Sequence, residues 1–307
     1  MRAKIILAGL LLAVSLSSFA CDVCGGGGSG NFQGVVPLFG QNQFSFRTNF
    51  FTATQGNALF NGTSQVLKDQ FFQQEFTYRK FSSNKMIYSF SLPTGMNSRI
   101  ETERTTRITG IGDAQIGAAR IFVNTSDSSF RSVKHILTLG VGMALPTGKY
   151  MQRDETQLRL PAYFQLGRGA YAYSFNLYYV IRRKNLGLAL TGQERVFSKN
   201  ELSYQFGKSS VLSAVAFYRW NIPTLGATVL PQMGFAFEQQ GQDTSYGIVE
   251  TSTGGKQSWG NFALDVYRGR WAYGINLQRK ISSNLPAGQA ESQLRCGIQV
   301  TYRLAKK

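Results

Sequence analysis

Apolar and polar side chains alternate along most of this sequence, and the alternation is cleanest near its end. In residues 291–304, Leu294, Cys296 and Ile298 share one parity, and Arg295 and Gln299 share the other. Successive side chains of a β-strand point to opposite faces, so this segment predicts a strand with one apolar and one polar face. A tilted strand of about ten residues is long enough to cross a bilayer.

The same alternation recurs along the chain, separated by polar segments rich in Gly, Asn and Ser. It predicts strands at residues 43–54, 70–81, 86–92, 113–123, 133–145, 157–166, 171–182, 186–197, 201–207, 211–220, 227–238, 258–267, 271–281 and 291–304. The connections alternate between long ones, such as 93–112 and 239–257, and short ones, such as 82–85 and 268–270. Long loops on one side and short turns on the other are typical of outer-membrane barrels.

These features predict an all-β fold, a transmembrane antiparallel β-barrel of about 14 strands (12–14). In lipid every backbone N–H and C=O group needs a partner, so we expect the last strand to pair with the first and close the sheet. On this topology the short turns lie in the periplasm. The aromatic rings of Trp271 and Tyr302 are then expected near the headgroup level of the membrane.

Composition supports a barrel over a helical membrane protein. The chain is 43% hydrophobic and 13% aromatic but only 16% charged, against about 25% charged residues in average domains. The mean hydropathy of −0.16, with no apolar run of about 18 residues after the N-terminus, excludes a bundle of membrane helices.

The N-terminus resembles an export signal. Arg2 and Lys4 precede a short apolar run, and residues 18–20 (SFA) offer a small-residue cleavage site. We therefore expect a cleaved signal peptide at residues 1–20, a Cys/Gly-rich periplasmic leader or plug at 21–42, the barrel at 43–304 and a tail at 305–307. The predicted location is the outer membrane of a Gram-negative cell.

Cys21 and Cys24 form a C-x-x-C pair at the expected mature N-terminus. The pair could form a disulfide in the oxidising periplasm or remain as inert thiols. Cys21 could alternatively carry a lipid anchor, or the two thiols could serve a metal or redox role, although no nearby His supplies a further ligand. The metal prediction therefore stays unknown, and no cofactor is expected.

The chain is strongly basic, with a net charge of +17 that falls to +15 when Arg2 and Lys4 are removed with the signal. Export argues against nucleic acid as the partner. The remaining explanations are contact with the phosphates of lipopolysaccharide and other outer-membrane lipids, or a lumen that favours anions.

Several charged residues have the parity of the polar, lumen-facing side. They are Arg47, Glu75, Arg79, Asp113, Arg182, Arg195, Asp265, Arg295 and Arg303. These residues either pair across the lumen and stiffen the wall or leave arginines that form a path for anions.

The single histidine, His135, has the outward parity and is expected on the lipid side near the periplasmic rim. A catalytic base needs a nucleophile or water within reach and a third group that orients it. The sequence offers no such constellation, so we expect no enzyme activity.

Several Gly- and Pro-containing segments resemble a known family. Residues 109–113 (TGIGD), 139–149 (LGVGMALPTGK) and 165–169 (QLGRG) occur in the same order in the outer-membrane transporter family linked to the meta-pathway of phenol degradation, and residues 91–95 (SLPTG) echo the second of these. The start at Cys21 is also similar to a subset of such barrels. The shared positions are Gly110, Gly112, Asp113, Pro146, Thr147, Gly148, Gly167 and Gly169.

The resemblance covers roughly residues 85–304 and implies a barrel distantly similar to long-chain fatty-acid transporters. It also implies passage of small, often hydrophobic or aromatic, molecules. The closing strand departs from the pattern because it ends at Leu304 rather than at a terminal aromatic. Tyr302 is expected to serve instead as the signal for the barrel-assembly machinery.

The favoured function is therefore passive uptake or diffusion of a small solute, hydrophobic or anionic, through a porin-like transporter. The alternatives are a structural or surface-interaction barrel with a plugged lumen, and a metal-associated protein acting through Cys21 and Cys24.

Overall fold

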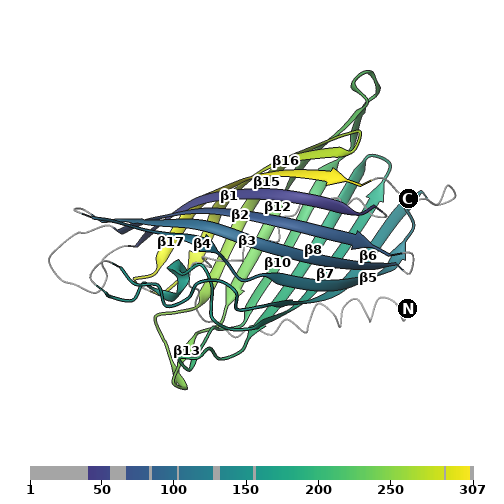
Figure 1. The fold of residues 1–307 in the computed structure, drawn as a ribbon. Coiled ribbons are helices and arrows are strands. Elements are labelled where there is room, and N and C mark those ends of the chain that lie inside the picture. The colour runs from purple at the N-terminus through teal and green to yellow at the C-terminus, as the bar shows by residue number, and fades with distance from the viewer. Residues whose placement is uncertain are drawn as a thin grey trace, which may run out of the picture.

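The chain folds into a closed antiparallel β-barrel of 12 strands (Figure 1). The computed structural model describes residues 41–55, 67–82, 85–101, 104–126, 132–154, 157–286 and 288–304. The predicted signal peptide, Cys21, Cys24 and nearly all of the leader lie outside these residues. None of the helices within the described part of the chain is long and apolar enough to span a membrane.

The barrel strands are β1 (Gln43–Gln55), β2 (Leu67–Phe81), β3 (Met86–Ile100), β5 (Gln115–Asn124), β6 (Val133–Ala144), β7 (Ala172–Arg183), β8 (Leu186–Phe197), β10 (Ser209–Tyr218), β12 (Ala227–Gln240), β15 (Gly255–Arg268), β16 (Trp271–Asn284) and β17 (Ala290–Arg303). The short elements are β4 (Thr105–Ile111), β9 (Tyr204–Gln205), β11 (Trp220–Ile222), β13 (Thr244–Ser245), β14 (Ile248–Val249) and the 3₁₀ turns η2 (Ala162–Phe164) and η3 (Pro223–Leu225).

The sheet closes in the predicted way, because β17 pairs with β1. Val300 lies opposite Phe46, and Arg303 lies opposite Gln43. The neighbours β10 and β12 also pair directly, from Ser209 opposite Gln240 to Phe217 opposite Gln232. The short strand β11 continues beside β12 outside the ring.

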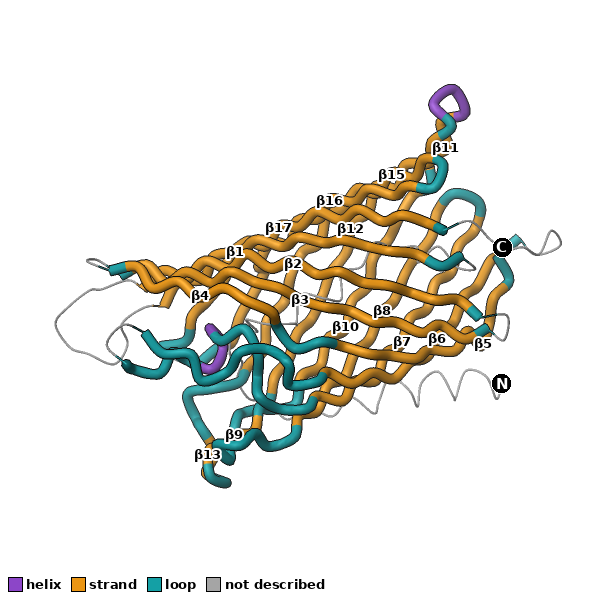
Figure 2. The backbone as a smooth tube through the Cα atoms, viewed as in Figure 1, coloured by secondary structure: helices purple, strands orange, loops and turns teal. Residues whose placement is uncertain are grey.

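The two ends of the barrel differ, as the loop lengths predict. We call the end with the connections at 82–85, 184–185 and 269–270 the turn end, and the end with residues 145–171, 198–208 and 241–254 the loop end. At the loop end, β14, β13 and β9 form a separate three-stranded sheet that stands away from the barrel wall, near the β13 label (Figure 2).

The predicted count of about 14 strands is wrong, because two of the predicted segments are not wall strands; the 12 strands observed equal the lower limit of the predicted range. Residues 157–166 carry Leu158, Leu160 and Phe164 on one parity, which looks like a strand, but Pro161 precedes the 3₁₀ turn η2 and the segment lies in the loop end. Residues 201–207 contribute only the two-residue strand β9. Leu160 and Phe164 are buried inside the barrel mouth and Leu158 is exposed, so the apolar alternation here does not mark a lipid-facing strand.

The predicted long polar loop at 93–112 is also wrong, because these residues extend the sheet. β3 continues through Pro93 to Ile100, and β4 returns beside it from Thr105. The N–H of Gly112 donates to the carbonyl of Pro93 (2.8 Å) at the break where the partner of β3 changes from β4 to β5. Polar side chains suit this part of β3, since Thr94 and Asn97 line the lumen.

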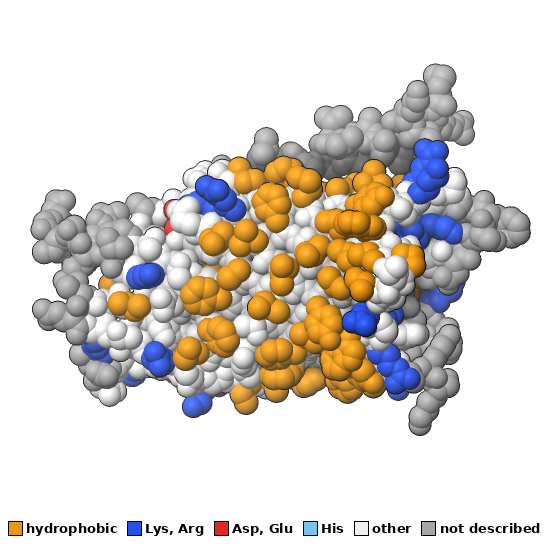
Figure 3. All heavy atoms as spheres, turned by 90° about the horizontal axis from the view of Figure 1, so that it is seen from above, with side chains coloured by type: hydrophobic (Ala, Val, Ile, Leu, Met, Phe, Trp, Pro, Cys, Tyr) orange, Lys and Arg blue, Asp and Glu red, His pale blue; other side chains and the backbone are white. Residues whose placement is uncertain are grey.

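The outer face of the barrel is apolar. Phe235 is 68% exposed, Ile298 60% and Val141 55%. Figure 3 shows hydrophobic side chains distributed over this outer surface, with Lys and Arg side chains mainly toward the ends. The predicted outward side of the closing strand is confirmed, because Leu294 and Ile298 are exposed while Arg295 is buried.

Candidate functional site: the barrel lumen and its inward loop

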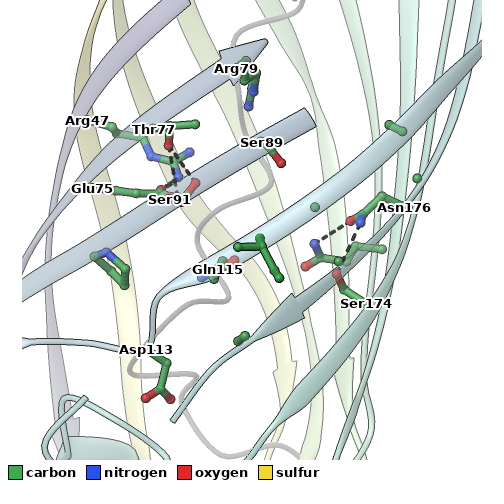
Figure 4. Close-up of a pocket in the computed structure, with 18 of the residues that line it drawn as sticks. Arg47, Glu75, Thr77, Arg79, Ser89, Ser91, Asp113, Gln115, Ser174 and Asn176 are labelled. Atoms are coloured by element: carbon green, nitrogen blue, oxygen red, sulfur yellow. Dashed lines mark hydrogen bonds and ion pairs between the residues drawn. The ribbon is translucent and has the colours of Figure 1, made fainter. Parts of the chain in front are cut away.

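The lumen wall is built from the inward side chains of neighbouring strands. Arg47 on β1 lies directly opposite Glu75 on β2, and the two form an ion pair. Thr77 lies next to them and shares a hydrogen bond of 2.9 Å with Ser91 on β3. Figure 4 shows these side chains pointing into one cavity, with Arg79 further along β2.

The lumen encloses a cavity of about 350 Å³. This volume lies at the lower end of the range of small-molecule sites, about 300–1,000 Å³. Its wall carries many polar side chains beside apolar surface, with amides such as Gln73, Gln115, Asn176 and Gln193 and many hydroxyl groups. Its charged residues are Arg47, Arg79, Arg168 and Arg195, with Glu75, Asp113 and Asp265.

Each carboxylate in this wall accepts hydrogen bonds from the protein itself. Asp113 accepts from the backbone N–H groups of Gly148 and Arg168, each at 2.9 Å. Asp265 accepts from the side-chain amide of Gln232 at 2.7 Å and, at 3.3 Å, from the hydroxyl of Tyr267. Internal donors therefore offset the negative charge that the wall presents to a solute.

Three of the nine charged residues of the sequence prediction lie outside the cavity lining. Arg295 is buried nearer the loop end, where it pairs with Glu238 (2.8 Å) and stacks over Trp259, with its guanidinium carbon 3.8 Å from the ring centroid. Arg182 donates to the carbonyl of Lys184 at 2.8 Å, and Arg303 donates to the carbonyl of Gly269, both at the turn end.

The segment with residues 145–154 and 157–171 enters the lumen from the loop end and narrows it with Leu160, Phe164 and Leu166. We call this segment the inward loop. Phe164 is fully buried and lies edge-on to Phe71 at a centroid distance of 5.9 Å, and Phe71 stacks on Phe51 at 4.6 Å. The complete buried cluster is Phe51, Ala53, Phe71, Ile108, Leu160, Phe164 and Ala290. An apolar core therefore fills part of the mouth of an otherwise polar barrel.

A polar latch holds the tip of the inward loop against the wall. The hydroxyl of Tyr163 donates to Asp69 at 2.8 Å, and Arg99 donates to both oxygens of the same carboxylate, each at 2.8 Å. Nearby, the side-chain amide of Asn97 donates to the carbonyl of Phe164 at 2.7 Å. The latch is charge-assisted and bidentate, which makes its hydrogen bonds stronger than neutral ones.

The base of the inward loop is fixed by the segments that resemble the known family. The hydroxyl of Thr147 accepts from the N–H of Ala114 (2.8 Å) and donates to the carbonyl of Gly112 (3.1 Å). Asp113 binds the N–H groups of Gly148 and Arg168, as described above. We call this set of contacts the clasp. The three motif segments, distant in sequence, meet at one joint between the wall and the inward loop.

The sequence pattern did not find Arg168, Tyr163 or Phe164 as lumen residues. Arg168 lies over the rings of Phe197 and Phe206, with its guanidinium carbon 4.4 and 4.6 Å from their centroids. Its signal in the sequence is its place within residues 165–169, one of the segments that resemble the known family. Nothing in the local alternation shows that this segment enters the barrel.

A further buried carboxyl, that of Asp243, lies outside the barrel wall, next to the small sheet at the loop end. Asp243 accepts hydrogen bonds from the hydroxyl of Tyr204 and from the N–H of Gly207, and its own N–H donates to Thr253. Burial raises the pKa of the Asp243 carboxyl above its ordinary value, although these hydrogen bonds oppose the shift.

His135 lies on the outer face of the barrel at the turn end, where its Nδ1 is 2.8 Å from the hydroxyl of Tyr179. Within the described ranges, no group of three or more His, Cys, Asp or Glu side chains is arranged to hold a metal ion. Cys296, on the outer face of β17, is a free thiol.

No protein family model and no curated protein matches this sequence. Among solved structures, the COG4313 outer membrane channel from Pseudomonas putida F1 is similar with a TM-score of 0.67 and 15% identity, over 90% of this chain and 98% of that one. The likeness shows that the fold is a closed antiparallel β-barrel of the outer-membrane type. A KdgM porin (TM-score 0.44, 11% identity, 86% and 99% of the chains) and the beta domain of the Bordetella autotransporter BrkA (0.49, 9%, 86% and 100%) are less similar.

Proposed function

We propose that this protein spans the outer membrane and conducts small polar solutes passively, with a preference for anions. A barrel with an apolar outer face and a polar lumen suits this role, because lipid contacts the first and water fills the second. The observation that carries the proposal is the cavity of about 350 Å³, whose wall is rich in amides and hydroxyls. The more specific link to phenol degradation stays a prediction.

The preference for anions rests on the charges of the cavity wall. Four arginines and three carboxylates line it, and each carboxylate is already engaged by donors of the protein, as the ion pair of Glu75 with Arg47 illustrates. Ion selectivity in a narrow pore follows the sign of the charges that its wall presents. A small organic anion would therefore meet a wall of net positive character.

Planar lipid bilayers test the proposal directly. The purified protein is inserted under a KCl gradient, and the reversal potential is read from current–voltage curves. We expect discrete conductance steps and a reversal potential with the sign of chloride selectivity. A cation-selective current would overturn the proposed anion preference but not the proposed channel function. The absence of current from verified, folded insertions would overturn the proposed channel function.

The second candidate function is a closed barrel that acts through its external surface. The apolar cluster around Phe164 favours it, because it occupies part of the lumen at the loop end. In the bilayer experiment this candidate predicts no conductance in the wild type. It also predicts new conductance when Phe164→Ala removes the largest side chain that the inward loop contributes to the cluster.

A further inference from the structure

Basic residues gather at the turn end of the barrel. Those in the turns or in the strand residues nearest to them are Lys80, Lys85, Arg120, Lys134, Arg182, Arg183, Lys184, Arg219, Arg268, Arg270 and Arg303. The chain's large net positive charge is therefore not spread evenly. Much of it forms a ring around one rim.

Acidic residues are missing from the described parts of this rim. No Asp or Glu occurs among the described residues of the turn-end connections, which are 82, 85, 125–126, 132, 184–185, 219–226 and 269–270. The acids nearest to the rim along their strands, Asp265 and Glu75, face the lumen. Among the described residues, no carboxylate forms an ion pair with Lys80, Arg120, Arg183 or Arg268.

Four of the cations point outward, toward the region that lipid would occupy: Lys80, Arg120, Arg183 and Arg268. Each is exposed, and each lies opposite an exposed apolar or aromatic residue of the neighbouring strand. Lys80 lies opposite Tyr88, Arg183 opposite Leu186 and Arg268 opposite Trp271. Arg120 lies opposite Leu139, which is also exposed.

Aromatic rings complete the rim. The guanidinium carbon of Arg120 is 5.5 Å from the ring centroid of Phe122. Trp271 packs on Tyr302 with centroids 4.8 Å apart, and Arg270 donates to the hydroxyl of Tyr302 at 3.4 Å. Aromatic rings favour the headgroup level of a bilayer, and long basic side chains there reach toward phosphates while their stems stay in apolar surroundings.

We propose that this rim binds the phosphate groups of anionic glycerophospholipids in the leaflet at the turn end. The inference rests on the proposed function only in requiring that the barrel spans a membrane. The cations supply charge complementarity, and the apolar band beside them receives the acyl chains. The binding holds the barrel at a fixed depth and surrounds its rim with anionic lipid.

Spin-labelled lipids measure this binding. The full-length protein is reconstituted in phosphatidylcholine vesicles, and the association constants of spin-labelled phosphatidylglycerol and phosphatidylcholine with the barrel are compared. We expect wild-type protein to prefer phosphatidylglycerol by about threefold or more at low salt, and the preference to fall as salt screens the charges.

The test variant carries Lys80→Gln, Arg120→Gln, Arg183→Gln and Arg268→Gln, which removes the outward cations. The matched control carries Arg153→Gln, Lys199→Gln, Lys208→Gln and Arg279→Gln, four exposed cations of the loop end, so both variants lose the same charge. The preference should fall to about one in the test variant and stay near the wild-type value in the control.

Two results would overturn the proposal: an unchanged preference in the test variant, or an equal loss in both variants, which would assign the effect to net charge alone. Heat-dependent electrophoretic mobility verifies that each variant is folded. Conductance recorded from the same preparations separates the two proposals. A channel without lipid preference refutes only the lipid site, and lipid preference without conductance refutes only the channel.

Discussion

Gly148 and Gly167 approach each other so closely that a Cβ built on Gly167 would lie 2.5 Å from the carbonyl group of Gly148. A side chain at Gly148 is excluded in the same way, since a Cβ built there would lie 2.7 Å from the Cα of Gly167. Both neighbours are backbone atoms, which cannot rotate away. The first and last parts of the inward loop are therefore in backbone contact, and glycine at both positions is what permits the clasp to close.

We expect Gly167→Ala to loosen the inward loop and destabilise the barrel by about 1–3 kcal/mol, as overpacking does in other tightly packed sites. The control is Gly260→Ala, where the nearest atom lies 3.6 Å from the new Cβ. The temperature at which heat-dependent electrophoretic mobility is lost measures the effect. Equal unfolding temperatures for both variants would show that the contact is not limiting.

We expect Tyr163→Phe to make the inward loop open more often, because it removes the hydroxyl that donates to Asp69. A hydrogen bond to a charged group contributes about 1.5–3 kcal/mol, and about 1.4 kcal/mol changes an equilibrium tenfold. Single-channel recording should show a several-fold rise in the time spent in a higher conductance state. Tyr246→Phe, at an exposed position of the outer loops, is the control and should leave the recording unchanged.

We expect Arg79→Gln to reduce anion selectivity, because it removes one of four positive charges from the cavity wall. The reversal potential under a KCl gradient should move toward zero while the barrel remains folded. Arg279→Gln changes a cation exposed near the loop end of β16 and should leave the reversal potential near the wild-type value. A shift of the same size in the control would place the selectivity outside the lumen.

We expect the small sheet at the loop end to be more stable in acid than at neutral pH. The folded protein raises the pKa of Asp243, so the folded state binds the proton more tightly than the unfolded state. The stabilisation is complete below the ordinary pKa of Asp and is lost as the pH rises through the raised value. Hydrogen exchange of the Gly207 N–H, which donates to Asp243, should accelerate over that range.

Asp243→Asn tests the cause of this pH dependence, since the amide keeps an acceptor oxygen but does not titrate. After correction for the intrinsic effect of pH on exchange, the local opening that exposes the Gly207 N–H should be nearly independent of pH in this variant. A variant as pH-dependent as the wild type would assign the effect to a titratable group other than Asp243.

The family-like segments illustrate how far sequence patterns extend. Their Gly, Pro and Asp positions predicted strand ends and turns, and the structure gives those residues a joint role: Asp113, Thr147 and Gly148 fasten the inward loop to the wall. No sequence pattern showed that residues 109–113, 147–149 and 165–169 meet, because the contacts join segments up to about 55 positions apart. The residues of a turn are neighbours in sequence, whereas these contacts form only when the tertiary structure brings distant segments together.

The sequence by itself determined the barrel, because lipid outside and water inside force a two-residue alternation onto every wall strand, and the closure of β17 on β1 follows from the need to pair every backbone group. Only the tertiary structure decided the strand number and the interior. The alternation of Leu158, Leu160 and Phe164 is the same whether the apolar side meets lipid or other side chains, and here Leu160 and Phe164 are buried against Phe51 and Phe71 inside the mouth. Parity shows which side chains share a face; what covers that face, or leaves it exposed as at Leu158, is set by residues distant in sequence.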